Sequence, residues 1–258
     1  MDELKGLSET IKETKEALPD TVNQTDGVLS TVVGFFNYVV LYPIRKANIS
    51  FRYKLEDFER DLQQKISQIP EENLQEPPVM IAGPTLEALR YTYDEYELRE
   101  MYENLLVAAM DSRNVQKAHP SYVDIIKQLS PFDAIVLKSV FPKGQMLCAD
   151  IDFKIKDTEK IYAVAMPSVF APDLLFLGDP FQISVSIENL RRLGLLSIID
   201  NAIVGADYSY LKEIDYVKER KELYEGYGEE ITIVITPQAL RISDYGKTFG
   251  TICLSKEE

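Results

Sequence analysis

FQISVSIENLRRLGLLSIID, residues 181–200, holds a helix, its end and the start of a strand in one stretch. Ile183, Ile187 and Leu190 recur at the spacing of one helix face. Gly194 follows, and glycine is the usual residue just past a helix because it adopts a left-handed backbone without steric cost. LLSII then has the composition of a strand. The stretch therefore predicts a helix that passes directly into a sheet.

The elements on either side of this stretch predict one mixed unit over 130–254. Ser130 is suited to a helix N-cap, Pro131 to the first helical position and Asp133 to the capping box. Residues 142–180 look irregular, with β-leaning pieces such as IYAVAM, and 201–229 form a charged, Tyr-rich insertion. EITIVIT is a β-branched strand, after which Ser243 can cap a closing helix.

This order of helices and strands resembles a winged helix-turn-helix unit. The residues that carry the likeness are Asn189, Leu190, Leu193, Gly194, Leu195, Leu196, Ser243 and Gly246. The connection between the two wing strands is unusually long, because it contains the whole insertion 201–229.

The preceding region, 1–129, is predicted to be helical. Amphipathic patterns cover 2–18 and 51–66, and further helical patterns cover 85–113 and the residues after Pro120. Residues 69–84 contain four prolines and are expected to form an extended connector. The predicted fold class is therefore α+β, mainly α, with a helical N-terminal half and a winged-helix-like C-terminal part that has a small sheet.

An uncharged segment at 28–44 precedes Arg45 and Lys46. As a helix it would present a broad apolar surface that includes Val32, Val33, Phe35, Phe36, Val39 and Val40. Three interpretations remain open. The segment could be a membrane span, for which about 17 residues is the lower limit of length, or a membrane-surface helix whose basic neighbours meet anionic headgroups. It could also be a central or oligomer-forming helix covered by neighbouring amphipathic helices.

The composition argues against a polyanion as the partner. The formal net charge is −14, so the average field repels DNA, RNA and anionic lipid. The predicted recognition helix at 181–193 offers Arg191 and Arg192 as exposed cations, with Glu188 beside them. Direct base readout needs a larger set of Arg, Lys, Asn or Gln on one face. Nucleic-acid binding through these two arginines is therefore the weaker alternative.

No recognisable catalytic or cofactor motif occurs in the sequence. Phosphate-binding glycine loops are absent, as are the metal and nucleophile motifs HExxH and GxSxG. His119 is the single histidine and precedes Pro120 at a helix start, where local capping or packing is the usual role. Cys148 and Cys253 are far apart in apolar settings, which favours two reduced, buried thiols. We expect a non-enzymatic protein without a cofactor.

Five segments together resemble the Abi-alpha family (abortive infection protein alpha) of bacterial and phage-encoded proteins. They are IPEENLQEPPVMIAGPTLEAL, ELREMYENLLVAAMD, HPSYVDIIKQLSP, ISVSIENLRRLGLL and ISDYGKTFGTIC, and they cover most of 65–253 in order. The resemblance implies an intracellular protein connected with phage defence. It implies no reaction and no catalytic residue.

Two hypotheses of function follow. The first is a cytoplasmic phage-defence protein that acts by contact with a protein partner or with itself. The second is a membrane-acting effector at the inner face of the cell membrane, for which 28–44 would supply the inserting surface.

Overall fold

The computed structural model describes residues 49–158, 160–162 and 166–254. These residues form two compact units, one built from residues up to 128 together with 251–254 and the other from Leu129–Gly250. The helices of the first unit are α4 (Ile49–Ile66), the 3₁₀ helix η3 (Glu71–Asn73), α5 (Val79–Thr92), α6 (Tyr96–Met110) and α7 (Ser121–Lys127).

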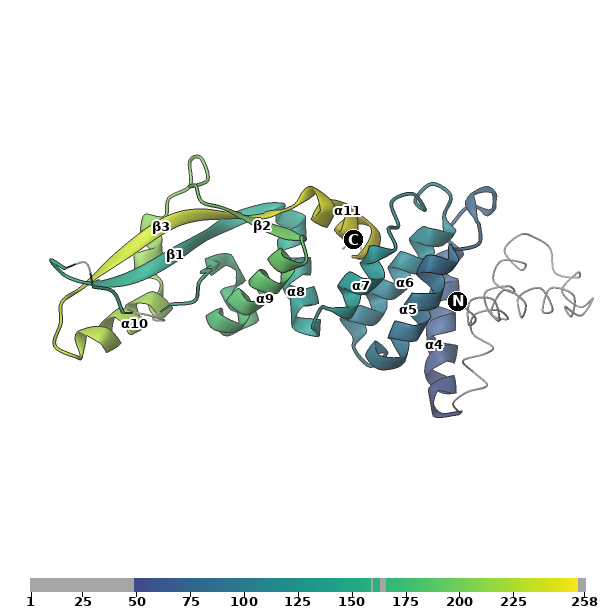
Figure 1. Cartoon of the computed structure of the whole chain (residues 1–258), viewed down its shortest axis with the longest axis horizontal. Coiled ribbons are helices and arrows are strands. Elements are labelled where there is room, and N and C mark those ends of the chain that lie inside the picture. The colour runs from purple at the N-terminus through teal and green to yellow at the C-terminus, as the bar shows by residue number, and fades with distance from the viewer. Residues whose placement is uncertain (1–48, 159, 163–165, 255–258) are drawn as a thin grey trace, which may run out of the picture. The chain divides into compact units, whose positions relative to one another are not determined.

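The second unit combines helices with a small sheet (Figure 1). Its elements are α8 (Pro131–Val140), η4 (Phe141–Lys143), β1 (Gln145–Ile155), η5 (Pro172–Leu177), α9 (Pro180–Arg192), β2 (Leu196–Ile199), η6 (Ser209–Glu213), α10 (Asp215–Glu225) and β3 (Ile231–Ile242), and α11 (Asp244–Cys253) runs on past its end. The predicted class, α+β and mainly helical, is confirmed.

Helix α6 forms the centre of the first unit. It packs against α4, α5 and α7, and its fully buried residues include Met101, Tyr102, Leu105 and Leu106. The predicted helix at 51–66 is confirmed as α4. Residues 85–113 do not form one continuous helix, because the chain turns between Thr92 and Tyr96.

The prediction of an extended connector over 69–84 is wrong from Val79 onward, where α5 begins. Pro78 is the N-cap residue of α5, and Pro84 lies inside the helix. Pro78 costs nothing at the helix start, because N–H groups there have no partner within the helix, whereas Pro84 removes one bond from the helix interior. Burial of Ile81, Leu86 and Leu89 on one face stabilises the helix despite Pro84.

A buried carboxylate joins two helices of the first unit. Glu103 on α6 is almost completely buried and accepts a 2.8 Å hydrogen bond from Nζ of Lys65 on α4. Nε of Arg99 lies 3.6 Å from the other carboxylate oxygen. Burial raises the pKa of Glu103 above its ordinary value, against the opposing effect of these two cations.

The stability contributed by Glu103 should therefore fall as pH rises. Its folded-state pKa is above the unfolded value of about 4.3, so protonated Glu103 favours the folded state, and that contribution is lost as pH rises through the folded-state pKa. We expect the difference in unfolding free energy between wild type and Glu103→Gln to decrease between acid and neutral pH in urea titrations. Glu87→Gln, on the exposed side of α5, controls for loss of a carboxyl group as such. A difference that grows with pH would contradict this assignment.

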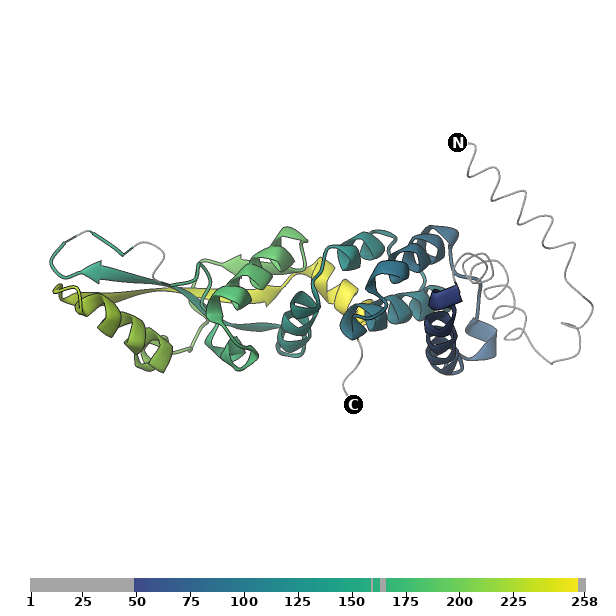
Figure 2. The ribbon, with the colours of Figure 1, turned by 90° about the horizontal axis from the view of Figure 1, so that it is seen from below.

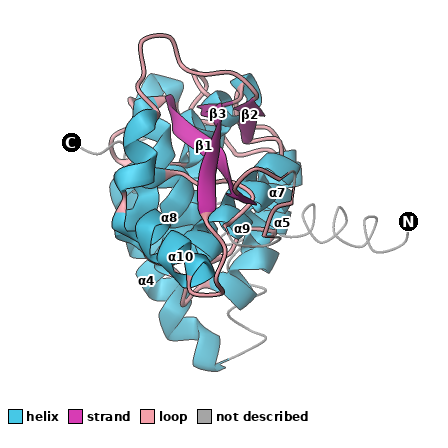
Figure 3. Ribbon diagram, turned by 90° about the vertical axis from the view of Figure 1, so that its left-hand side faces the viewer, coloured by secondary structure: helices cyan, strands magenta, loops and turns pink. Residues whose placement is uncertain are grey.

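The sheet of the second unit has the strand order β1-β3-β2 and is antiparallel throughout. β1 pairs with β3 from Gln145↔Arg241 to Ile155↔Ile231, whereas β2 pairs only with the last four residues of β3. Helices α8, α9 and α10 lie on the same side of this sheet, as the strands in Figure 3 and the view in Figure 1 both show.

Much of 142–180 was predicted to be irregular, and this is wrong for Gln145–Ile155, which form β1. β1 alternates buried residues such as Ile151 and Phe153 with partly exposed Asp150 and Asp152. This two-residue period is the signature of a strand with one face covered. The strand predicted at EITIVIT is longer than expected, because β3 continues through Pro237 to Ile242.

Two helix ends match their predicted chemistry. Gly194, just after α9, has a φ of 76°. Its N–H donates to the carbonyl of Arg191 at 2.8 Å, and the N–H of Leu195 donates to the carbonyl of Leu190 at 2.9 Å. These two bonds make a Schellman motif. At the start of α11, Oγ of Ser243 accepts a 2.8 Å bond from the N–H of Gly246, as expected of an N-cap.

Candidate interaction surface

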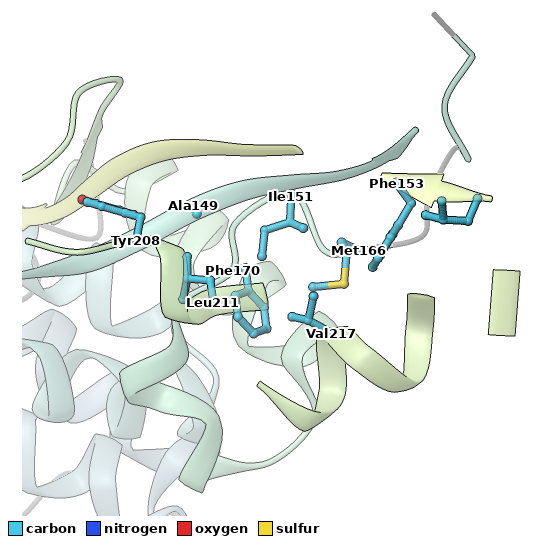
Figure 4. Packing of buried hydrophobic residues seen from close by; sticks show 9 residues of the cluster. Ala149, Ile151, Phe153, Met166, Phe170, Tyr208, Leu211 and Val217 are labelled. Carbon is cyan, nitrogen blue, oxygen red and sulfur yellow. The ribbon is translucent and has the colours of Figure 1, made fainter. Parts of the chain in front are cut away.

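The paired strands β1 and β3 carry α10 along part of their length (Figure 2). A separate hydrophobic cluster lies between them, made by Ala149, Ile151, Phe153, Met166, Phe170, Tyr208, Leu211, Val217 and Ile231. In Figure 4, Ile151 and Phe153 point from β1 toward the layer that contains Met166 and Val217. This local core holds α10 against the strands through apolar burial.

A chain of aromatic rings extends from this core to the surface. The ring centroid of Tyr224 lies 5.8 Å from that of Phe153 and 4.4 Å from that of Tyr162. The ring of Tyr227 lies 6.4 Å from Tyr162 and 6.2 Å from Tyr224. These separations are within the range of favourable aromatic pairs, so each ring fixes the position of the next.

The outer end of this chain is solvent-exposed. Tyr227, in the turn after α10, is 68% exposed, and Leu223, near the end of α10, is 52% exposed. We refer to Tyr162, Leu223, Tyr224 and Tyr227 as the aromatic surface. Tyrosine is enriched in the energetically important part of protein interfaces, since it combines large apolar area with a hydroxyl group and few rotatable bonds.

The base of α10 is fixed independently of the aromatic surface. The guanidinium of Arg220 lies 5.1 Å from the ring centroid of Tyr216, and its Nη2 donates to the Tyr216 hydroxyl at 3.2 Å. Tyr216 in turn stacks on Phe170 at 6.2 Å. The inner face of α10 is therefore fixed by contacts that do not involve the aromatic surface.

The candidate nucleic-acid contacts lie at the end of α9 and are both exposed. Nη1 of Arg191 is 2.8 Å from a carboxylate oxygen of Glu188, and Arg192 donates to Oδ1 of Asn189 at 2.8 Å and 3.1 Å. Val185, on an exposed position of the same helix, is 71% exposed. An apolar residue in this place and an acidic partner for Arg191 do not suit a phosphate backbone.

Asp133 was expected to complete a capping box, and the structure confirms this and adds two partners. Its Oδ2 accepts from the N–H of Ser130 at 2.8 Å, while Oγ of Ser130 accepts from the N–H of Asp133 at 3.1 Å. Oγ of Ser186 donates to Oδ1 at 2.6 Å and Nδ2 of Asn189 donates to Oδ2 at 2.9 Å. This buried carboxylate therefore joins α8 to α9.

The apolar and basic residues proposed for a partner or membrane, from Val32 through Lys46, lie outside the described residues. Those positions stay predictions: Val32, Val33, Phe35, Phe36, Val39, Val40, Arg45 and Lys46. None of the helices within 49–158, 160–162 and 166–254 is long and apolar enough to cross a membrane.

The single histidine and the two cysteines have local contacts or burial typical of structural residues. Nδ1 of His119 accepts from the N–H of Ser121 at 3.1 Å at the start of α7, which is the expected capping role. Cys148 and Cys253 are unpaired and buried, and burial raises the pKa of the Cys148 thiol to about 12. Within the part of the chain that the structure describes, no group of three or more His, Cys, Asp or Glu side chains could hold a metal ion.

Sequence reasoning missed the aromatic surface, although it noted the Tyr-rich composition of the insertion. The available signal was the pair Leu223 and Tyr227, four residues apart beside Tyr224. Tyr162 could not be joined to them, because it precedes α10 by many residues and reaches it only through the fold. Its N–H bonds the carbonyl of Phe153 at 2.9 Å, which sets it beside β1.

Comparison with known proteins gives a family and no closer relative. No curated protein and no solved structure matches the chain significantly. The family model described as abortive infection alpha matches residues 50–253, which span the second unit and part of the first. This chain belongs to the abortive infection alpha (Abi_alpha) family.

Proposed function

We propose that this protein takes part in abortive infection of phage-infected bacteria by binding a protein partner through the aromatic surface, without a reaction of its own. The observation that carries the proposal is the exposed pair Leu223, on α10, and Tyr227, in the turn just after it, with α10 itself held by Val217 and Tyr216. Exposed apolar side chains that are held in place lose little conformational freedom on binding.

The winged-helix prediction supports a role in protein contact. α8, β1, η5, α9, β2 and β3 follow one another in the order of that unit, and a sheet order β1-β3-β2 suits it. We infer that the second unit is a winged helix whose wing connection is enlarged by η6 and α10. A recognition helix with exposed Val185 favours a protein over a duplex as its partner.

Truncation of the aromatic surface should abolish protection from phage. Truncating a residue at the centre of an interface commonly weakens binding by about 2 kcal/mol, which is roughly thirtyfold in affinity. We expect bacteria that express wild type to resist members of a phage panel and bacteria that express Leu223→Ser/Tyr227→Ser to lose that resistance, measured as efficiency of plating. The two residues are largely exposed, so the thermal unfolding of the purified variant should match wild type closely.

Glu222→Ser is the matched control, because Glu222 is an exposed residue of the same helix outside the aromatic surface. It should protect like wild type at an equal protein level. A folded double variant that still protects would exclude the aromatic surface, and a wild-type protein that protects against no phage would exclude the role in abortive infection.

A further inference from the structure

One edge of β3 has no strand beside it over most of its length. β1 pairs with β3 from Ile231 to Arg241 on one side, and β2 covers only Ala239 to Ile242 on the other. Among the described residues, no other strand pairs with β3. The residues from Thr232 to Pro237 therefore have no strand beside them on the side of β2, whereas Ile231 is buried and the carbonyl of Gln238 accepts from the Tyr208 hydroxyl at 2.8 Å.

The direction of the backbone groups along this edge follows from β1. Ala149 exchanges both backbone hydrogen bonds with Phe170, each at 2.9 Å, on the side of β1 away from β3. Ala149 and its partner Pro237 therefore form a non-hydrogen-bonded pair. Because such pairs alternate along an antiparallel ladder, Ile235, Ile233 and Ile231 also direct their N–H and C=O groups away from β1.

The far end of β3 shows the same alternation. The N–H of Ile242 bonds the carbonyl of Gly144 at 2.9 Å, on the side of β1. The N–H of Ser243 bonds the carbonyl of Leu195 at 3.0 Å, on the side of β2. Odd-numbered residues of β3 thus face β2 where β2 is present, and face the open edge where it is absent.

The chemistry of the open edge favours pairing with another strand. No charged residue occurs from Ile231 to Leu240, and ITIVIT consists entirely of β-branched residues. Natural edges are commonly blocked by lysine, proline or a bulge. Here Pro237, which lacks an N–H, ends the row of donors between the open residues and β2.

We propose that a second copy of this chain pairs antiparallel with this edge, β3 to β3, centred on Ile233. Ile233 then faces Ile233 of the other copy, and this pair exchanges both N–H···O bonds. Ile235 lies opposite Ile231, which is buried in the free chain. The arrangement is self-complementary, as a two-fold dimer requires.

Charge also favours a second copy as the occupant. In this register Glu230 of one chain lies opposite Thr236 of the other, so no like charges meet. Nζ of Lys156 already neutralises Glu230 at 2.6 Å. Thr232 lies opposite Val234, which joins two β-branched residues across the interface.

Removing the backbone N–H of Ile233 tests the proposal. We expect the full-length protein to be a dimer in sedimentation and light scattering, and Ile233→Pro to raise the dissociation constant at least about tenfold. Proline removes an N–H that β1 does not use, as Pro237 already does. Ile233→Val is the matched control, since it shortens the side chain but keeps the donor, and it should remain dimeric.

Amide exchange of wild type, followed by NMR, gives a second test that needs no variant. The amides of Ile233 and Ile235 should exchange slowly at high protein concentration and quickly on dilution. Those of Thr232, Val234 and Thr236, which face β1, should be protected at both concentrations.

A wild type that is monomeric at all concentrations would overturn the proposal. A dimer in which the amides of Ile233 and Ile235 exchange freely would do the same, as would Ile233→Pro that dimerises like wild type. The inference is independent of the aromatic surface: Leu223→Ser/Tyr227→Ser should still dimerise, so that failure of one proposal leaves the other standing.

Discussion

Replacing Asp133 with alanine is expected to destabilise the second unit by about 3–5 kcal/mol, because each buried donor left without an acceptor costs about 1–3 kcal/mol and loss of a helix cap about 1 kcal/mol. The substitution leaves three donors without an acceptor: the N–H of Ser130, Oγ of Ser186 and Nδ2 of Asn189. It also removes the capping box of α8 and the polar contact between α8 and α9. Urea unfolding followed by circular dichroism measures the change.

Asp179→Ala is the matched control for Asp133→Ala. Asp179 is the N-cap of α9, and its Oδ2 accepts from the N–H of Gln182 at 3.0 Å, but its side chain is exposed. Water can replace that bond, so we expect a loss of about 1 kcal/mol. Equal losses for the two variants would show that Asp133 acts as a helix cap alone.

Gly246→Ala is expected to destabilise the second unit by about 3 kcal/mol, the upper end of the usual loss from overpacking. A Cβ atom at this position would lie 2.1 Å from the carbonyl oxygen of Leu195 and 2.9 Å from its carbonyl carbon. The obstacle is backbone, which the Schellman motif after α9 and the bond from Ser243 hold in place. The strand and the helix must therefore separate.

Gly83→Ala is expected to stabilise the protein, although it is the same glycine-to-alanine change. Gly83 lies in α5, and a Cβ atom there meets nothing within 4 Å. Alanine loses less backbone entropy than glycine in a helix, so this variant should be about 0.5–1 kcal/mol more stable than wild type. A thermal shift of the same sign in both variants would contradict the close approach at Gly246.

Local chemistry predicted several elements because their signals lie within a few residues. The capping box at Ser130 and Asp133, the end of α9 at Gly194 and the cap at Ser243 are all confirmed at their predicted positions. Each depends on hydrogen bonds between near neighbours, which residue type largely determines.

Long-range pairing explains what the sequence did not predict. β1 was missed because its carboxylates, Asp150 and Asp152, appear unfavourable in a strand until β3 supplies the partner. The first six residues of α5, 79–84, were predicted to be extended because Pro78 precedes them and Pro84 is the last of them, and their burial depends on packing against α6. The aromatic surface required Tyr162 and Tyr224 to meet, and no local pattern encodes that contact.

The wide separation of β1 and β3 along the chain has a kinetic consequence. The closest pair in sequence is Ile155 with Ile231, and α9, β2 and α10 are all synthesised between them. At a translation rate of about 5–20 residues per second, β1 waits roughly 4–15 s on the ribosome before its partner exists. Ladders of high contact order close slowly. The sheet of the second unit should therefore form late in synthesis, and β1 stays without its partner strand until β3 has emerged.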